Sequence, residues 1–506
     1  MKSIITVDAR GAGQGKTTDP TSGIYSKIKQ LRRFDEQVII VTPSKDLQSQ
    51  YHKDLEKESI EVAVVNSGTD LEAKSSIKKQ LDEVLQKQTS VISITDQGFK
   101  HNVIDYNDKK HYHLILDECI KPISSHTIIS KYFPLSTPRW NRVFTKTTEV
   151  IIPGYCELEL TSAAKNDPIG QSIDYVNYRI FVKESEYDEF MKTYKFKDAS
   201  MTYMAVLRPD RLEGWKSIHI AAAAFEYTLT CQWLKMFNID YKIDREFIPH
   251  EMTPTKKLYI YFSEKNISKR QYVKGTKMVE RLQSFAASIA KDGEYISLYN
   301  KDIIDEDEID HIKNGHKIKH NAHGINHFQH INTCLVLSTL NYSKTMQDFI
   351  DMITPGVSKL ATETYTHYQF IMRSSLRNNS DGDCHVIIPS GISAAKITNF
   401  FKNDENVVCV NIIDQVGNLT VKTKENIDIK TVLSELEDKF YNIPGYPQYQ
   451  LSPALILRKW SGDTFVDTDK SHLLENNQTV NLGKTGQIRI KALIKLTFKE
   501  NKNVNN

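Results

Sequence analysis

Residues 4–18 read IITVDARGAGQGKTT, an apolar run followed by a glycine-rich turn that ends in a lysine and two threonines. The turn nearly completes the pattern GxxxxGK[ST], with Arg10 in place of the first glycine. Glycines let the backbone direct consecutive N–H groups inward, and the N-terminus of a following helix adds a favourable partial charge. The stretch therefore predicts a strand, a phosphate-binding loop and a helix, in that order.

Each polar residue of the predicted loop has a task. Lys16 would neutralise the β- and γ-phosphates of a nucleotide, and Thr17 would ligate Mg²⁺. Pro20 falls near the start of the following helix, where a missing N–H costs little. We expect ATP and Mg²⁺ as cofactors, and the predicted nucleotide-binding residues are Gly11, Gly13, Gln14, Gly15, Lys16, Thr17 and Thr18.

The apolar run 113–116, HLIL, is followed by Asp117 and Glu118. In a parallel sheet the carboxyl ends of the strands hold the ligand, so both carboxylates are expected at the phosphate-binding edge. Asp117 would complete the Mg²⁺ ligands, and Glu118 would orient or deprotonate the attacking water. A phosphate-binding loop together with this acidic pair indicates a nucleoside triphosphatase.

Short apolar runs alternate with amphipathic stretches, which is the rhythm of a parallel α/β sheet. We predict strands at 4–7, 38–41, 62–65, 91–94 and 114–116, and helices at 24–34, 44–56 and 70–86. Residues 121–215 break the rhythm and are interpreted as an irregular insertion. A second alternating block follows, so the predicted domains are 1–245, 255–400 and a C-terminal α+β extension at 401–506.

The composition is that of an ordinary soluble protein. The chain has 506 residues, and 66 basic against 63 acidic side chains leave a net charge of +3, which excludes a polycationic nucleic-acid binder. No run of about 18 apolar residues is present, and the N-terminus lacks a signal-peptide pattern. We therefore expect a cytoplasmic protein with no membrane partner, whose six dispersed cysteines are reduced.

Two further loops follow predicted strands. Residues 41–50 read VTPSKDLQSQ, and residues 94–99 read ITDQGF. With the loop and acidic motifs, this order resembles that of superfamily 2 helicases, the DEAD/DEAH-like group, in the divergent form carried by phages and mobile elements. The resemblance implies two RecA-like domains and nucleic-acid contacts through Thr42, Pro43, Ser44, Thr95 and Gln97. Short polar loops and helix N-termini suit sequence-independent binding of phosphates.

The second block contains Gln369, Arg373 and Arg377, each four residues apart. On a continuous helix over 364–377 all three would project from one face. This resembles helicase motif VI, which implies that they reach across the cleft to the γ-phosphate, a task that suits the planar and permanently charged arginine fork. The spacing leaves open whether Arg373 or Arg377 is the arginine finger.

Two other motifs are less specific. The segment 321–326, NAHGIN, resembles motif V, which implies nucleic-acid contacts from His323 and Gly324. Motif III has two candidates, TSA at 161–163 and IHIAA at 218–222, and the second is preferred because it forms the better buried strand.

The resemblance covers residues 1–400 and implies an ATP hydrolase that couples turnover to movement along nucleic acid, with DNA favoured over RNA. The implied catalytic residues are Lys16, Asp117, Glu118, Gln369, Arg373 and Arg377. Candidate partners include single-stranded or forked DNA and replication or recombination proteins. Two alternatives remain open: a viral terminase-type packaging ATPase, and a non-translocating ATP-driven switch that remodels nucleoprotein.

Overall fold

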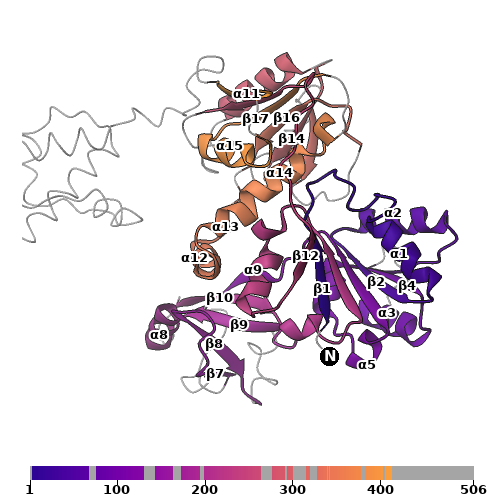
Figure 1. Cartoon of the computed structure of the whole chain (residues 1–506). Coiled ribbons are helices and arrows are strands. Elements are labelled where there is room, and N and C mark those ends of the chain that lie inside the picture. Colours follow the sequence, from indigo (N-terminus) through magenta and orange to yellow (C-terminus); the bar gives the residue numbers. More distant parts are fainter. Residues whose placement is uncertain are drawn as a thin grey trace, which may run out of the picture. The chain divides into compact units, whose positions relative to one another are not determined.

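The computed structural model describes residues 3–67, 76–129, 143–162, 173–193, 199–263, 276–290, 293–299, 315–319, 327–338, 340, 342–377, 382–402 and 405–412. Within these ranges, two parallel sheets with flanking helices and one antiparallel sheet account for the strands (Figure 1). The predicted α/β fold class with two parallel-sheet domains is confirmed. The predicted extension beyond residue 412 lies outside the described residues.

Lobe 1, residues 3–245, is built on a seven-stranded sheet in the order β12-β1-β11-β5-β2-β4-β3. Every pairing in it is parallel. Helices cover both faces of such a sheet, so its central strands are continuous apolar runs, and the side chains of 38–41 are at most 1% exposed. The strands are β1 Ile4–Asp8, β2 Gln37–Thr42, β3 Ala63–Val65, β4 Val91–Thr95, β5 Tyr112–Asp117, β11 Ser217–Ala221 and β12 Lys242–Arg245.

The helices of lobe 1 follow the predicted periodicity. Ser44 caps α2 by accepting a hydrogen bond from the amide of Leu47, and Ser76 caps α3 in the same way through Lys79. The predicted helix over 70–86 is described from Ile77 onward. The helices are α1 Ile24–Arg33, α2 Lys45–Glu56, α3 Ile77–Gln86, α4 Asp96–His101, α5 Tyr106–Lys109 and α9 Leu229–Met236, with 3₁₀ turns η3 Pro209–Leu212 and η4 Phe225–Tyr227.

The stretch predicted as an irregular insertion forms a regular antiparallel sheet in the order β6-β10-β9-β8-β7. This insertion sheet packs against α12 Lys344–Ile353, because Phe349, which is fully buried, meets the ring of Tyr155 edge-on at 4.9 Å. Its elements are β6 Ile123–Ile129, β7 Phe144–Lys146, β8 Tyr155–Leu160, β9 Tyr178–Lys183, α8 Glu184–Thr193 and β10 Ser200–Leu207.

Lobe 2, residues 258–412, contains a six-stranded parallel sheet in the order β15-β14-β16-β17-β13-β18. The sheet continues past the predicted domain boundary at 400, because β18 pairs with β13. Its strands are β13 Leu258–Phe262, β14 Tyr295–Tyr299, β15 Gly315–Lys319, β16 Thr333–Leu337, β17 Cys384–Ile388 and β18 Val407–Asn411. Its other helices are α11 Thr276–Ile289, α13 Val357–Lys359, the π-helical turn η7 Leu360–Thr364, α14 Tyr365–Ile371, the 3₁₀ turn η8 Ser375–Arg377 and α15 Gly391–Thr398.

The predicted continuous helix over 364–377 is wrong. Helix α14 ends at Ile371. The amides of Arg373 and Ser374 then bond to carbonyls three residues back, where an α-helix would use those four residues back. The hydroxyl of Ser374 accepts from Leu376 and donates to the carbonyl of Ile371, so side-chain bonds replace the helical ones. Arg373 therefore lies in a turn, and Arg377 lies in η8.

No helix in the part of the chain that the structure describes is both long and apolar enough to cross a lipid bilayer.

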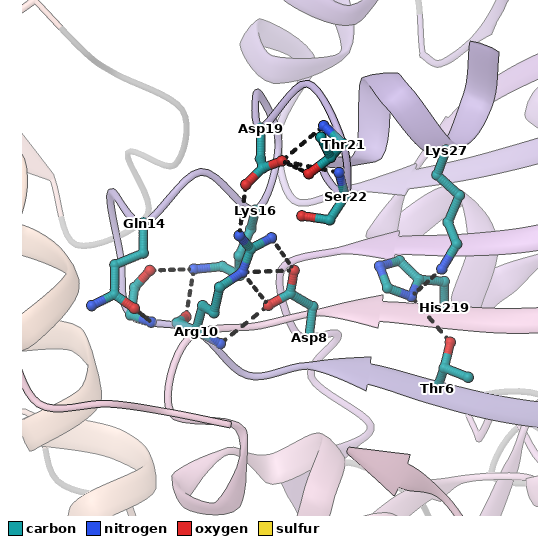
Figure 2. Close-up of polar contacts among 11 residues, drawn as sticks. Thr6, Asp8, Arg10, Gln14, Lys16, Asp19, Thr21, Ser22, Lys27 and His219 are labelled. Atoms are coloured by element: carbon teal, nitrogen blue, oxygen red, sulfur yellow. Dashed lines mark hydrogen bonds and ion pairs between the residues drawn. The ribbon is translucent and has the colours of Figure 1, made fainter. Parts of the chain in front are cut away.

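A buried histidine on β11 makes the stability of lobe 1 depend on pH. The Nδ1 atom of His219 lies 2.9 Å from the Lys27 ammonium and 3.1 Å from the Thr6 hydroxyl (Figure 2). Burial lowers the pKa of His219 to about 3, and the Lys27 charge adds to the shift. The unfolded chain, with an ordinary histidine pKa of about 6.5, therefore binds the proton more readily.

We expect the free energy of unfolding to fall by about 1.4 kcal/mol per pH unit from this one group as pH drops below about 6.5. Urea titrations at pH 7, 6 and 5 measure the slope, and His219→Gln should reduce it. The exposed His111, replaced in the same way, is the control. An equal slope in wild type and His219→Gln would contradict the assignment.

Candidate nucleotide site

The loop after β1 wraps around the side chain of Lys16. Gly13 and Gly15 adopt φ of 81° and 80°, a left-handed backbone that favours glycine, and this allows the tight turn. The Lys16 ammonium donates to the carbonyls of Arg10 and Gly11 at 2.9 and 2.8 Å (Figure 2). Burial lowers the pKa of Lys16. The loop thus holds a desolvated cation among backbone oxygens at the carboxyl edge of the sheet.

Arg10, which replaces the first glycine of the pattern, joins two carboxylates. Its guanidinium donates to Asp8 from Nε at 2.9 Å and from Nη2 at 2.6 Å, and Nη1 lies 3.2 Å from Asp19 (Figure 2). Burial alone would raise the pKa of Asp8, but the hydrogen bonds and charge of Arg10 hold it below its ordinary value. This cluster ties the end of β1 to the segment that follows the loop.

Residues 19–22 form an extra turn between the glycine loop and α1. The amide of Ile24 bonds the carbonyl of Lys16 at 2.9 Å, and that of Tyr25 bonds Thr17 at 3.2 Å, so these bonds span eight positions in place of four. A Cβ on Gly23 would lie 2.7 Å from backbone atoms of Asp19 and Thr17, which requires glycine there. The helix predicted at 24–34 does start at Ile24, and Pro20 lies in the turn before it.

Two acidic residues end β5 beside the loop. The hydroxyl of Tyr51 donates to Asp117 at 2.7 Å and also interacts with the hydroxyl of Thr17. Burial and the neighbouring Glu118 raise the pKa of Asp117 to about 7. Because one tyrosine contacts both predicted Mg²⁺ ligands, Thr17 and Asp117 are held close together, and their oxygens fit a divalent cation.

Glu118 has a φ of 73°, a left-handed conformation that is unusual for a residue with a Cβ. Its amide donates to the carbonyl of Ala221 on β11 at 2.9 Å, which holds the backbone in this conformation. The turn directs the chain away from the β5 ladder directly after Asp117. Strain of this kind clusters at functional sites, so it agrees with the task predicted for Glu118.

Helix α14 of lobe 2 contacts both parts of this site. The hydroxyl of Tyr368 accepts from the amide of Ala12 in the loop at 2.9 Å. The hydroxyl of Tyr365 lies 3.5 Å from the Glu118 carboxylate and accepts from Gln369 at 3.1 Å. A buried face of α14 therefore touches the loop through Tyr368 and Glu118 through Tyr365.

Both predicted arginines face the same region although they lie beyond the helix. A Cβ on Gly13 would lie 2.8 Å from Cγ of Arg377, so this side chain packs directly on the loop. Arg373 is 8% exposed, and burial lowers its pKa to about 10 while the Glu118 charge opposes the shift. With Gln369 and Glu118, Arg373 lines a cavity of about 300 Å³. The structure thus brings Lys16, Glu118, Gln369, Arg373 and Arg377 together.

The sequence reasoning missed three tyrosines and one acidic residue. Tyr365 and Tyr368 precede Gln369 by four and one positions, and the helical spacing of Tyr365 and Gln369 was a usable signal. Asp8 ends β1 as Asp117 ends β5, so its place at the carboxyl edge could have been inferred. Nothing in the sequence around Tyr51 signals its contact with Asp117.

The predicted nucleic-acid residues are not all accessible. Thr42 is fully buried and donates to the carbonyl of Ser44, so in this conformation it cannot contact a nucleic acid, contrary to the prediction. Pro43 and Ser44 are half-buried. Thr95 caps α4 by accepting from the amide of Gly98.

Gln97, in the first turn of α4, is exposed. His323 and Gly324 lie outside the described residues.

Of the two candidates for motif III, the preferred stretch 218–222 lies beside the site. It contains most of β11, which pairs with β1 on one side and β5 on the other. The amide of Ala222 bonds the carbonyl of Asp8 at 3.0 Å. Thr161 instead follows β8 in the insertion sheet, where its amide bonds the carbonyl of Val143.

Comparisons with known proteins found similarity among solved structures. No family model and no curated protein sequence matches the chain. The structure is similar to S. tokodaii Xpd4, with 13% identity and a TM-score of 0.41 over 80% of this chain and 96% of that one.

It is also similar to Mss116p bound to ssRNA and AMP-PNP, with 12% identity and a TM-score of 0.36 over 87% and 78% of the two chains. A third is the helicase MrfA bound to DNA and AMPPNP, with 10% identity and a TM-score of 0.35 over 92% and 56%.

The Arg10–Asp8 pair is buried enough to test by a double-mutant cycle. The side chains are 12% and 2% exposed, so Arg10→Ala leaves a buried carboxylate without its main partner. We expect Arg10→Ala to lower the free energy of unfolding by about 3 kcal/mol. The double variant with Asp8→Ala should be more stable than the sum of the single effects by about 2 kcal/mol, as measured by urea unfolding.

The exposed pair Lys29–Glu58, at 2.9 Å, is the control, and its coupling should stay below about 1 kcal/mol. Equal coupling in the two pairs would show that Arg10 does not stabilise Asp8.

Proposed function

We propose that the chain is an ATP-dependent nucleic-acid helicase or translocase, with DNA as the favoured substrate. The observation that carries the proposal is the convergence of three motifs from two lobes. The glycine loop with Lys16 and the acidic pair of β5 come from lobe 1, and Arg377 from lobe 2 packs on Gly13 of that loop. Arginine that meets a phosphate-binding loop across two domains is the arrangement that lets nucleotide state control domain closure.

The residues of lobe 1 divide the hydrolysis between them. Lys16, now bonded to the carbonyls of Arg10 and Gly11, would exchange these acceptors for oxygens of the β- and γ-phosphates. Thr17 and Asp117 would hold Mg²⁺, which supplies neutralisation of phosphate charge when bound. Glu118 would accept the proton of the attacking water. Tyr365 and Gln369 would hold the Glu118 carboxylate toward the cleft, through the contacts described above.

The residues of lobe 2 would sense the γ-phosphate. Arg373 and Arg377 carry positive charge toward Glu118, which supports a role in stabilising the charge of the transition state. After phosphate leaves, this attraction is lost and the lobes would separate. Repeated closure and opening would move a nucleic-acid strand that is bound to both lobes.

The helix N-termini that follow β2 and β4 support sequence-independent contacts with a nucleic-acid strand. Ser44 and Thr95 cap helices α2 and α4, whose N-termini favour phosphate, and Gln97 is exposed in the first turn of α4. The preference for DNA rests on the resemblance to phage-type helicases.

The first prediction for this function concerns stimulation by nucleic acid. We expect ATP turnover to rise at least about tenfold with single-stranded or forked DNA, because strand binding promotes closure of the lobes. Lys16→Ala and Glu118→Gln should each lower turnover by about 10²-fold or more. Phosphate release against a panel of single-stranded, double-stranded and forked DNA and RNA is the measurement.

The outcomes separate the proposal from its rivals. Turnover that no nucleic acid stimulates would contradict a motor and favour an ATP-driven switch. Divalent-metal-dependent cleavage of DNA by the same preparation would favour a terminase-type packaging enzyme. The exposed Lys29→Ala is a matched control for Lys16→Ala, and its turnover should equal that of wild type.

The second prediction assigns the arginine finger. Arg377 contacts Gly13, and its charge contributes to lowering the pKa of Lys16, so it is the arginine nearer to the phosphate-binding loop. We therefore expect Arg377→Lys to lower kcat by about 10³-fold with little change in KM, because lysine lacks the planar fork.

Arg373→Lys should lower kcat by about tenfold, since it keeps a charge near Glu118. Steady-state kinetics of both variants measure the difference. A larger loss in Arg373→Lys than in Arg377→Lys would reverse the assignment.

A further inference from the structure

Helix α2 contains a buried tyrosine that reaches both predicted Mg²⁺ ligands. Tyr51 lies near the middle of α2 and is fully buried. Its hydroxyl donates to Oδ2 of Asp117 at 2.7 Å and interacts with the hydroxyl of Thr17. A hydrogen bond to one oxygen orients a carboxylate, as the outer partners of ligating carboxylates do in metal sites. The position of α2 therefore influences how these two ligands are arranged.

The same helix begins at a segment that is predicted to contact nucleic acid. Ser44 is its N-cap, and Pro43 precedes it. The dipole of the helix favours a phosphate at this end. Tyr51 follows Ser44 by seven positions, which is two turns of helix or about 10 Å along its axis. One short helix thus connects a proposed strand contact with the predicted Mg²⁺ ligands.

A second buried side chain joins α2 to the other predicted strand contact. Gln48 is fully buried, donates to the carbonyl of Ser93 at 2.8 Å and accepts from the side-chain amide of Asn66 at 2.8 Å. Ser93 lies in β4, two residues before Thr95, which caps α4. Since Gln48 and Tyr51 are on the same helix, a displacement at the end of β4 would also reach Tyr51 through packed and hydrogen-bonded groups.

The ring of Tyr51 is held independently of its hydroxyl. It packs on the ring of Tyr25, with 5.0 Å between centroids. Tyr25 lies in the first turn of α1, and its own hydroxyl donates to Asp54 of α2 at 3.1 Å. Both tyrosines therefore bind a carboxylate, but only that of Tyr51 is a predicted Mg²⁺ ligand. Removing one hydroxyl or the other separates this contact from the packing of α2.

We propose that Tyr51 is a positioning residue that couples strand binding at the start of α2 to the arrangement of Thr17 and Asp117. The proposal rests on the proposed function. A strand phosphate at Ser44 would draw α2 along its axis, and the Tyr51 hydroxyl would turn the Asp117 carboxylate with it. Shifts of about 1–2 Å in a packed helix are sufficient for such transitions. Because coupling between two binding events is reciprocal, each should strengthen the other by the same factor.

The experiment measures binding without turnover. Binding of a fluorescent mant derivative of AMPPNP is titrated with Mg²⁺, with and without saturating single-stranded DNA. In wild type, DNA should lower the Mg²⁺ midpoint by about tenfold, a typical strength of coupling between sites. In Tyr51→Phe the shift should fall below about twofold. At constant AMPPNP, the change in Kd for labelled DNA on adding Mg²⁺ should show the same factors.

Two comparisons distinguish coupling from a general loosening of α2. The Kd of Tyr51→Phe for DNA without Mg²⁺ should stay within about twofold of wild type, which also shows that the variant is folded. Tyr25→Phe is the matched control, because it removes a hydroxyl that binds α2 without contacting a predicted Mg²⁺ ligand. Its midpoint should keep the full shift.

The failures are distinguishable. A wild-type midpoint that DNA does not shift, an undiminished shift in Tyr51→Phe, or equal losses in Tyr51→Phe and Tyr25→Phe would overturn the role of Tyr51 while the proposed function stands. Wild-type protein that binds no nucleotide or no nucleic acid would overturn the proposed function itself.

Discussion

The buried hydrogen bond from the Ala12 amide to the Tyr368 hydroxyl fixes how the two lobes meet. Tyr368 is fully buried. Its ring stacks on that of Phe400, with 4.3 Å between centroids, and meets edge-on the ring of Phe247, between β12 and β13, at a centroid distance of 6.2 Å. A Cβ on Gly11 would lie 2.8 Å from the same hydroxyl, so the close approach depends on glycine. Since side chains on one helix keep fixed spacing, this contact also decides where Tyr365 and Gln369 lie relative to Glu118. The position of Tyr368 therefore sets where Tyr365 and Gln369 of α14 lie in the site.

Carboxylates surround the buried ammonium of Lys16. The lysine is desolvated, and the carboxylates of Asp8, Asp117 and Glu118 oppose the lowering of its pKa. Its ammonium donates to two carbonyls of the loop, which are the acceptors that phosphate oxygens would replace in the proposed function. In the proposed function, oxygen acceptors replace oxygen acceptors, so nucleotide binding would require little rearrangement of the loop backbone. Arg377, which packs on Gly13, would meet the added negative charge of the phosphates.

The sequence predicted the elements whose positions depend on the hydrophobicity of neighbouring residues. The strands at 38–41 and 114–116 are buried on both faces, so each is a continuous apolar run that is legible in the sequence. The antiparallel insertion sheet could not be predicted from the sequence, because a strand such as β10 is stabilised by pairing with β6, which is distant along the chain. The motif around Thr42 predicted contact with nucleic acid, but Thr42 is buried by tertiary packing that the motif does not encode. The contact between Tyr368 and Ala12 joins residues 356 positions apart, which single-sequence reasoning cannot reach.

The loop differs from the usual pattern in two ways that are linked by a hydrogen bond. Arg10 replaces a glycine, and residues 19–22 add a turn before the following helix. Arg10 donates to Asp19 of this turn, so the two differences stabilise each other. Asp19 in turn accepts from the amides of Thr21 and Ser22, so it organises the extra turn and anchors it to the loop (Figure 2). A glycine at position 10 would leave Asp8 buried without its partner and the added turn without its tether. The added residues enter after Lys16 and Thr17, on whose carbonyls the helix resumes, so they lie outside the turn that Gly13 and Gly15 form.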